Sequence, residues 1–348
     1  MDMMDHTSHE EQSHEETTTQ DHLSTPETPQ PSLEVDFVEE CYSKIKQELR
    51  KLVIGQEEMI DLLVAGLFSD GHILLEGVPG IAKTLTAKLF AKTITVGFSR
   101  VQFTPDLMPA DVIGTMVFNA QTSEFDFKKG PLFSNVILID EINRAPAKTQ
   151  SALFEVMQEK QISVDGHTYQ MQEPYLVLAT QNPIEQEGTY KLPEAQLDRF
   201  QFRVKLAYPS LEEEQQILQR FQHGNHAHKG EEVKAVMEVK DVLKCRDIIG
   251  KVSIEASLIN YVALLVHSTR NHGDIYLGAS PRASLSILHA SKAYAAMNGR
   301  GFVIPDDIRK MTVPVLNHRI ILTPDKEIEG VTTEEVIQEI IQSVEVPR

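Results

Sequence analysis

The chain contains the stretch Gly77-Val78-Pro79-Gly80-Ile81-Ala82-Lys83-Thr84, which directly follows the apolar run Ile73-Leu74-Leu75. A strand, a glycine-rich turn and the start of a helix are the context of a Walker A phosphate loop. Backbone N–H groups of such a loop, with the positive end of the helix, hold phosphate oxygens. Lys83 would reach the β- and γ-phosphates of ATP, and Thr84 Oγ1 would ligate Mg²⁺. The alternative is a strand-to-helix turn that only requires glycines.

The stretch departs from the strict Walker A pattern directly before the lysine, where Ala82 replaces a glycine. An alanine fits this position if its φ is negative, because the side chain of an L-residue disfavours a positive φ. We therefore expect a negative φ at Ala82.

A second stretch, Val136-Ile137-Leu138-Ile139-Asp140-Glu141, is an apolar run that ends in two acids, and Asp140 lies 57 residues after Lys83. The carboxyl ends of parallel strands line the ligand crevice of an α/β protein. Asp140 would hold Mg²⁺ through water, and Glu141 would polarise the attacking water. A strand that runs into an acidic turn is the alternative, but the accompanying phosphate loop favours a nucleotide site.

Five apolar runs predict strands, at residues 73–75, 101–103, 136–139, 175–179 and 202–206. Continuous apolar runs are typical of strands that are buried on both faces. With predicted helices at 83–93 and 147–159 between them, they indicate an α/β fold with a parallel five-stranded sheet covered by helices. After Pro209, apolar runs give way to predicted helices at 211–222, 241–250, 255–271, 280–298 and 305–317. We therefore expect an α/β core over 35–208, an α-helical lid over 209–322 and a C-terminal extension over 323–348.

The chain has 348 residues and a formal charge of −18. Residues 1–34 hold nine acids and no Lys or Arg, and they lack aromatic residues, so we expect a disordered acidic tail. The remainder has 33 basic and 42 acidic residues, which disfavours nucleic-acid binding. No window reaches the ~18 apolar residues of a membrane helix, so no direct membrane insertion is expected. Cys41 and Cys245 indicate reduced thiols in a cytoplasmic protein.

Several stretches together resemble the MoxR family of AAA+ ATPases, over roughly residues 37–322. They are the phosphate loop, Asp140-Glu141-Ile142-Asn143-Arg144-Ala145, Ala179-Thr180-Gln181-Asn182-Pro183, Leu192-Pro193-Glu194-Ala195-Gln196-Leu197-Asp198-Arg199-Phe200 and Gly278-Ala279-Ser280-Pro281-Arg282. An alanine before the lysine of the phosphate loop is also what that family shows. The resemblance implies binding and hydrolysis of Mg-ATP.

The resemblance also implies roles for individual residues. Asn182 would be sensor 1, which orients the water and the γ-phosphate, and Arg282 would be sensor 2, which touches the γ-phosphate of its own subunit's nucleotide. Arg199 would be the arginine finger that reaches the ATP of a neighbouring subunit, with Arg144 as a rival for that role. Ile54-Gly55-Gln56 would line the adenine pocket.

Each of these residues has a simpler alternative role. Asn182 precedes a proline, where asparagine is a common turn-capping residue. Arg199 could form an ion pair with Asp198, and Arg282 could be a surface arginine in the first turn of a helix.

Two insertions predict hairpins. In residues 105–135, Phe118, Phe125 and Phe127 alternate around a turn at 119–123, which suggests a hairpin that interrupts a helix. In residues 161–174, Asp165-Gly166 lies between β-like runs. In AAA+ relatives such hairpins face the ring pore or the substrate, and surface decoration without a role is the alternative.

The family resemblance implies a chaperone-like ATPase that remodels or matures partner complexes. It implies a homo-oligomeric ring, expected to be a hexamer, which works with von Willebrand factor A-domain proteins or another client protein. Two alternatives remain open: a metal-chelatase-type motor subunit, and a nucleic-acid-dependent AAA+ motor, against which the acidic body argues.

Overall fold

The computed structural model of the chain describes residues 33–78, 80–183, 190–222 and 232–347. Most of the predicted acidic tail, residues 1–32, lies outside the described residues. Leu33 and Glu34 already belong to helix α1 (Leu33–Arg50). None of the helices in the described ranges is long and apolar enough to cross a membrane.

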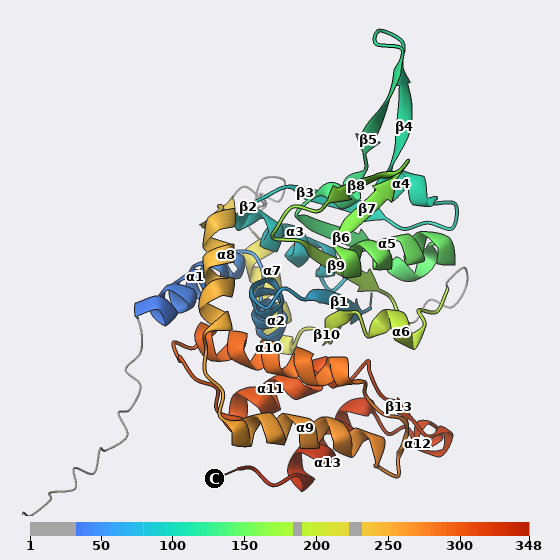
Figure 1. Ribbon diagram of the computed structural model, residues 1–348. Helices are drawn as coiled ribbons and strands as arrows, with labels where there is room; N and C mark the ends of the chain where they lie inside the picture. Colours follow the sequence, from blue (N-terminus) through green and yellow to red (C-terminus); the bar gives the residue numbers. More distant parts are fainter. Residues whose placement is uncertain (1–32, 79, 184–189, 223–231, 348) are drawn as a thin grey trace, which may run out of the picture. The chain divides into compact units, whose positions relative to one another are not determined.

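A five-stranded parallel sheet forms the centre of the α/β part, with the strand order β10-β1-β9-β6-β3 (Figure 1). Its strands are β1 (His72–Gly77), β3 (Phe98–Gln102), β6 (Val136–Asp140), β9 (Leu176–Gln181) and β10 (Phe200–Leu206). The predicted fold class is confirmed, and each strand contains or overlaps one of the five apolar runs. In this order β9 lies between β1 and β6, so the carboxyl ends of these three strands lie side by side.

The sheet is buried on both faces because successive side chains of each strand point in opposite directions. Ile73 and Leu75 of β1 belong to an apolar cluster with helices α1, α2 (Glu57–Phe68) and α3 (Lys83–Lys92). Leu74, between them, belongs to a second cluster with helix α5 (Ala147–Glu159). The unbroken apolar runs in the sequence follow from this two-sided burial.

After β10 the described chain is mainly helical. The helices are α7 (Leu211–Phe221), α8 (Val239–Gly250), α9 (Ala256–Arg270), α10 (Pro281–Met297), α11 (Pro305–Leu316), α12 (Pro324–Glu329) and α13 (Thr333–Ser343). The first five agree closely with the predicted helices. Two short strands, β12 (Ile275–Leu277) and β13 (Ile321–Leu322), pair in antiparallel fashion. Two other short strands, β2 (Ile94–Thr95) and β11 (Met237–Glu238), pair in parallel.

Helix α13 lies in the segment predicted as a C-terminal extension, and it packs against α9 and α11. It buries Val336, Ile337, Ile340 and Ile341. This spacing is typical of an amphipathic helix, and Thr332 and Glu335 form a capping box at its start. Both signals are visible in the sequence, so this helix could have been predicted.

Both predicted hairpins are present. Strands β4 (Gly114–Asn119) and β5 (Glu124–Lys129) form one, which follows the short helix α4 (Pro109–Ile113) and projects beyond the sheet (Figure 1). Strands β7 (Gln161–Val164) and β8 (His167–Gln170) form the other. Phe127 of the first hairpin packs on Tyr169 of the second, with ring centroids 4.7 Å apart. The two insertions are therefore in contact.

His72, at the start of β1, is a buried histidine with both ring nitrogens engaged. Nδ1 accepts the N–H of Val177 at 3.1 Å, so the proton of the neutral ring lies on Nε2, which donates to the carbonyl of Met157 at 3.1 Å. Burial lowers the pKa of His72 to about 4. A second proton on the ring would face the N–H of Val177.

We predict that His72 makes the protein less stable in acid. A histidine in the unfolded chain has a pKa of about 6.5. The stabilising contribution of neutral His72 is therefore complete above that pH and is lost as the pH falls towards 4. From pH 7 to pH 5 this residue should lower the free energy of unfolding by about 2 kcal/mol. Denaturant unfolding of His72→Gln should show a pH dependence smaller by this amount. The control is the same substitution at the exposed His167, His167→Gln. An equal pH dependence of the unfolding free energy in wild type and His72→Gln would contradict the lowered pKa of His72.

Candidate active site

The phosphate loop connects β1 to α3, and two of its residues have a left-handed backbone, Gly80 with φ +88° and Ala82 with φ +61°. The expected negative φ at Ala82 is therefore wrong. The loop needs a left-handed residue directly before α3, and an alanine there costs on the order of 1–2 kcal/mol. Such strain persists only where the surrounding structure imposes it, and it clusters at functional sites. Pro79 lies outside the described residues.

Close packing explains the first glycine of the loop. A Cβ on Gly77 would lie 2.5 Å from Ile81 Cδ1 and 2.9 Å from the carbonyl oxygen of Leu206. Only glycine lets the loop turn this tightly over the end of β10. Lys83 Nζ donates to the carbonyl oxygens of Gly77 and Val78, so the ammonium group lies within the turn.

Asp140, the last residue of β6, is buried and contacts the first turn of α3. Its Oδ1 accepts from Thr84 Oγ1 at 3.0 Å and from Thr180 Oγ1 at 3.3 Å, and its Oδ2 accepts from Arg100 Nε at 2.6 Å. A carboxylate beside a hydroxyl is an oxygen donor set of the kind that Mg²⁺ prefers. The two residues predicted to serve Mg²⁺ are thus in direct contact, and their chemistry fits the ion.

Glu141 follows with a left-handed backbone, φ +56°, and its N–H donates to Thr180 Oγ1 at 3.0 Å. Its carboxylate Oε2 accepts from Gln102 Nε2 at 2.8 Å and pairs with Arg144 Nε at 2.9 Å. Two side chains of the same chain therefore hold the Glu141 carboxylate. Arg144, the rival for the finger role, therefore contacts the carboxylate of its own subunit.

Sequence reasoning missed three polar residues here: Arg100, Gln102 and Thr180. Arg100 and Gln102 alternate on β3, which pairs with β6 so that Gln102 lies opposite Asp140. Arg100 and Gln102 are two residues apart, so their side chains lie on the same face of β3, and this spacing was a usable signal. Thr180 lies one residue before the end of β9, beside the carboxyl end of β6.

These groups line a cavity of about 500 Å³. Its lining residues are Gly80, Ala82, Lys83, Thr84, Leu85, Arg100, Gln102, Asp140, Glu141, Thr180, Gln181 and Asn182. Asn182 thus lines the same cavity as Lys83 and Asp140, and its role as sensor 1 stays a prediction. Ile54 and Gly55 do not line this cavity. A Cβ on Gly55, whose φ is +66°, would lie 2.3 Å from Glu213 Oε1 of α7, so this loop packs against α7.

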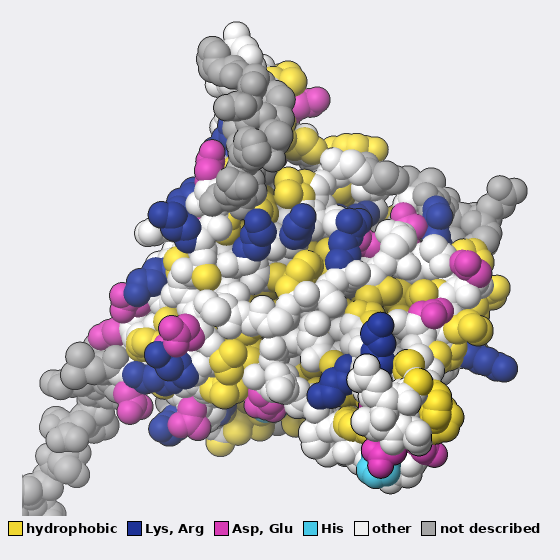
Figure 2. Space-filling view, turned by 90° about the horizontal axis from the view of Figure 1, so that it is seen from above, with side chains coloured by type: hydrophobic (Ala, Val, Ile, Leu, Met, Phe, Trp, Pro, Cys, Tyr) yellow, Lys and Arg dark blue, Asp and Glu magenta, His cyan; other side chains and the backbone are white. Residues whose placement is uncertain are grey.

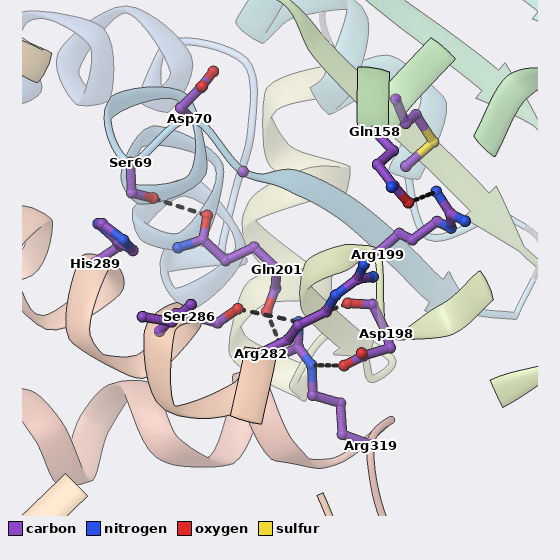
Figure 3. A pocket seen from close by; sticks show the side chains of 13 residues that line it. Ser69, Asp70, Gln158, Asp198, Arg199, Gln201, Arg282, Ser286, His289 and Arg319 are labelled. Carbon is purple, nitrogen blue, oxygen red and sulfur yellow. Dashed lines mark hydrogen bonds and ion pairs between the residues drawn. The ribbon is translucent and has the colours of Figure 1, made fainter. Parts of the chain in front are cut away.

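Arg199 and Arg282 line a different cavity, of about 280 Å³, which also receives Asp198 and Arg319 (Figure 3). Arg199 follows the short helix α6 (Glu194–Leu197), and Arg282 lies in the first turn of α10. Arg199 Nη1 donates to the carbonyl of Phe154 at 3.0 Å and to Gln158 of α5. Arg282 therefore lines the same cavity as Arg199, and its predicted role as sensor 2 stays a prediction.

Comparisons with known proteins match both the α/β part and the helical part of the chain. The ATPase family associated with various cellular activities (AAA) matches residues 72–202, and the AAA lid domain matches residues 267–340. The chain is 42% identical to YeaC of Bacillus subtilis (strain 168), over 87% of this chain and 94% of YeaC. It is 43% identical to Chaperone MoxR1 of Mycobacterium tuberculosis (strain ATCC 25618 / H37Rv), over 86% of this chain and 81% of that protein.

A solved structure from Cytophaga hutchinsonii ATCC 33406 is 44% identical and superposes with a TM-score of 0.83, over 90% of this chain and 97% of its own. A fold alone does not fix a function, but here the sheet order, the lid and relatives above 40% identity over most of the chain agree. The chain belongs to the MoxR family of AAA+ ATPases.

Proposed function

We propose that this ATPase binds Mg-ATP at the phosphate loop, hydrolyses it between two copies of the chain, and uses the energy for chaperone-like remodelling of a partner protein. The separation of the two cavities carries the proposal. The groups suited to phosphate and Mg²⁺ line one cavity, whereas Arg199 and Arg282 line another. Charge that develops on a transferred phosphoryl group needs cations around it. We propose that a neighbouring copy supplies those cations and that the copies form a closed ring, a hexamer.

Within one subunit, Lys83 would leave the carbonyls of the turn for the β- and γ-phosphates. Thr84 and Asp140 would hold Mg²⁺, which when bound neutralises charge on the phosphate oxygens. Arg100 would release Asp140 Oδ2 in this step, because the guanidinium and the ion compete for one carboxylate.

Glu141 would act as the general base that polarises the attacking water. Gln102 and Arg144 hold the Glu141 carboxylate. The water would therefore approach the carboxylate from the side that these two residues leave uncovered. Asn182 would orient the same water, as its place in the cavity wall allows.

The remodelling activity is proposed from the relatives and from one surface feature. One relative is named a chaperone. On the hairpin of β4 and β5, Phe118 and Phe125 stack edge to face with ring centroids 5.3 Å apart and are 54% and 64% exposed. Exposed aromatic pairs are suited to contact with another protein. We propose a von Willebrand factor A-domain protein as the partner and the cytoplasm as the location.

Glu141→Gln should retain ATP affinity and lose turnover, because it removes the base and leaves the phosphate and Mg²⁺ contacts in place. The loss of a general base typically costs ~10²–10⁴-fold in kcat. Lys83→Ala is the matched variant, and it should lose most ATP binding in calorimetry. An unchanged kcat in Glu141→Gln would disprove the assigned role of Glu141.

Mixing two inactive variants tests whether Arg199 acts on a neighbouring copy. Arg199→Ala should bind ATP normally and hydrolyse it at least ~10-fold more slowly, below the ~10³–10⁵-fold effect known from GTPases. In a mixed ring, an Arg199→Ala subunit keeps Glu141, and a Glu141→Gln neighbour supplies Arg199, so activity should return. A Glu141→Gln/Arg199→Ala double variant supplies neither group and should give no rescue. If co-assembled single variants stay inactive, a finger acting on the neighbour is excluded.

A capture experiment tests the kind of partner. Tagged Glu141→Gln protein with ATP should retain a von Willebrand factor A-domain protein from the native cell, whereas Lys83→Ala should not. Lys and Arg side chains extend across the middle of the face seen in Figure 2, so DNA and RNA belong in the same test. Stimulation of the wild-type ATPase activity by nucleic acid, or capture of a metal-chelatase complex by the Glu141→Gln protein, would overturn the proposed partner in favour of a different motor.

A further inference from the structure

A buried arginine of the lid, Arg319, joins the lid to the segment that carries Arg199. Its side chain is 2% exposed and it follows α11 by three residues. Arg319 Nε donates to Asp198 Oδ1 at 2.7 Å, Nη2 to the carbonyl of Phe200 at 2.7 Å, and Nη1 to the carbonyl of Val315 at 2.6 Å. Longer contacts reach the carbonyls of Asp198 and Gln201 and the hydroxyl of Ser286. A guanidinium used in this way fixes geometry, because its donors point in set directions.

The second oxygen of Asp198 continues the network into helix α10. Asp198 Oδ2 accepts from Ser280 Oγ at 3.0 Å, and Ser280 Oγ accepts in turn from the N–H of Arg282 at 3.2 Å. Ser280 is the N-cap of α10, so this hydroxyl also sets where the helix begins. One carboxylate therefore connects the lid arginine, the start of α10 and the residue before Arg199.

The network ends at the two arginines that line the smaller cavity. Arg199 is the residue after Asp198, and Arg282 is two residues after Ser280 (Figure 3). Arg199 Nε is buried and has no hydrogen-bond partner among the described residues. A buried, unsatisfied cationic donor at a cavity wall is suited to an anion from outside the chain.

We propose that Arg319 is a positioning residue, which through Asp198 and Ser280 holds Arg199 and Arg282 at one spacing so that both reach the phosphates of a neighbouring copy's nucleotide. This inference rests on the proposed function, in which those arginines act on the neighbour. Arg319 itself does not touch the nucleotide, because Asp198, a serine and backbone carbonyls take its donors. In this way a lid residue, Arg319, fixes the position of the proposed arginine finger, Arg199, in the α/β part.

The mixed-ring assay tests this inference because it separates the two faces of a subunit. Arg319→Lys keeps the charge but loses the planar fork that fixes Asp198. Placed in the Glu141→Gln subunit, which supplies the finger, it should lower the rescued activity at least ~10-fold, since a misplacement of about 1 Å can cost ~10²-fold. Placed in the Arg199→Ala subunit, whose finger is already absent, it should leave the rescue intact. A merely structural role would weaken both combinations equally.

Two further variants serve as a control and as a substitute for Arg319→Lys. Arg300→Lys in the Glu141→Gln subunit is the matched control, because Arg300 makes a bidentate pair with the buried Asp307 elsewhere in the lid, at 2.6 Å for both bonds. It should leave the rescue unchanged. If Arg319→Lys does not fold, Ser280→Ala can replace it, because it removes only one hydroxyl of the network. Ser280→Ala should likewise lower the rescued activity in the Glu141→Gln subunit and leave it intact in the Arg199→Ala subunit.

The outcomes distinguish a failure of the proposed function from a failure of the positioning role of Arg319. Failure of the single variants to rescue each other overturns the proposed function. Rescue that survives Arg319→Lys or Ser280→Ala in the Glu141→Gln subunit overturns the positioning role and leaves the proposed function standing. Equal loss in both placements also overturns it, since Arg319 would then only stabilise the fold.

Discussion

The hydrogen bond between Thr84 and Asp140, 3.0 Å long, is the contact on which the catalytic half of the structure depends. It joins the first turn of α3 to the end of β6, two elements that are adjacent only because the sheet has the order β10-β1-β9-β6-β3. With β9 between β1 and β6, the phosphate loop, the acidic pair and Asn182 open onto one cavity. Parallel strands place their ligand groups at a common edge, and the burial of both sheet faces holds that edge in position.

Two residues with a strained backbone lie at this same cavity. Ala82 and Glu141 both have a left-handed conformation, although neither is glycine. In each case the residue stands directly before a helix, α3 after Ala82 and a short 3-10 helix over Ile142–Arg144 after Glu141. Strain of this kind is kept where function requires the geometry, and the apolar clusters on the two faces of the sheet supply the stability that offsets it.

The fold was largely predictable because its signals are local: continuous apolar runs for the strands, glycines for the phosphate loop and proline-marked starts for α10 and α11. The phosphate loop and the acidic pair were predictable for the same reason. The sign of φ at Ala82 was not, because the direction of the following helix sets it. The place of Arg282 beside Arg199 could not be predicted from the sequence either, since it depends on how Asn317, His318 and Arg319 hydrogen-bond the lid to β10. The Ile54–Gly55 assignment came from family resemblance alone and stays a prediction; in the structure this loop packs against Glu213 of α7.

We propose that one copy of the chain binds the nucleotide and that a neighbouring copy supplies the arginines. A structure of the assembled full-length Glu141→Gln protein with Mg-ATP measures this directly. We expect the guanidinium groups of Arg199 and Arg282 to lie within hydrogen-bond distance, about 2.7–2.9 Å, of the γ-phosphate held by Lys83 of the adjacent copy. A γ-phosphate contacted by Arg282 or Arg144 of its own chain, with Arg199 still turned towards Gln158, would contradict it.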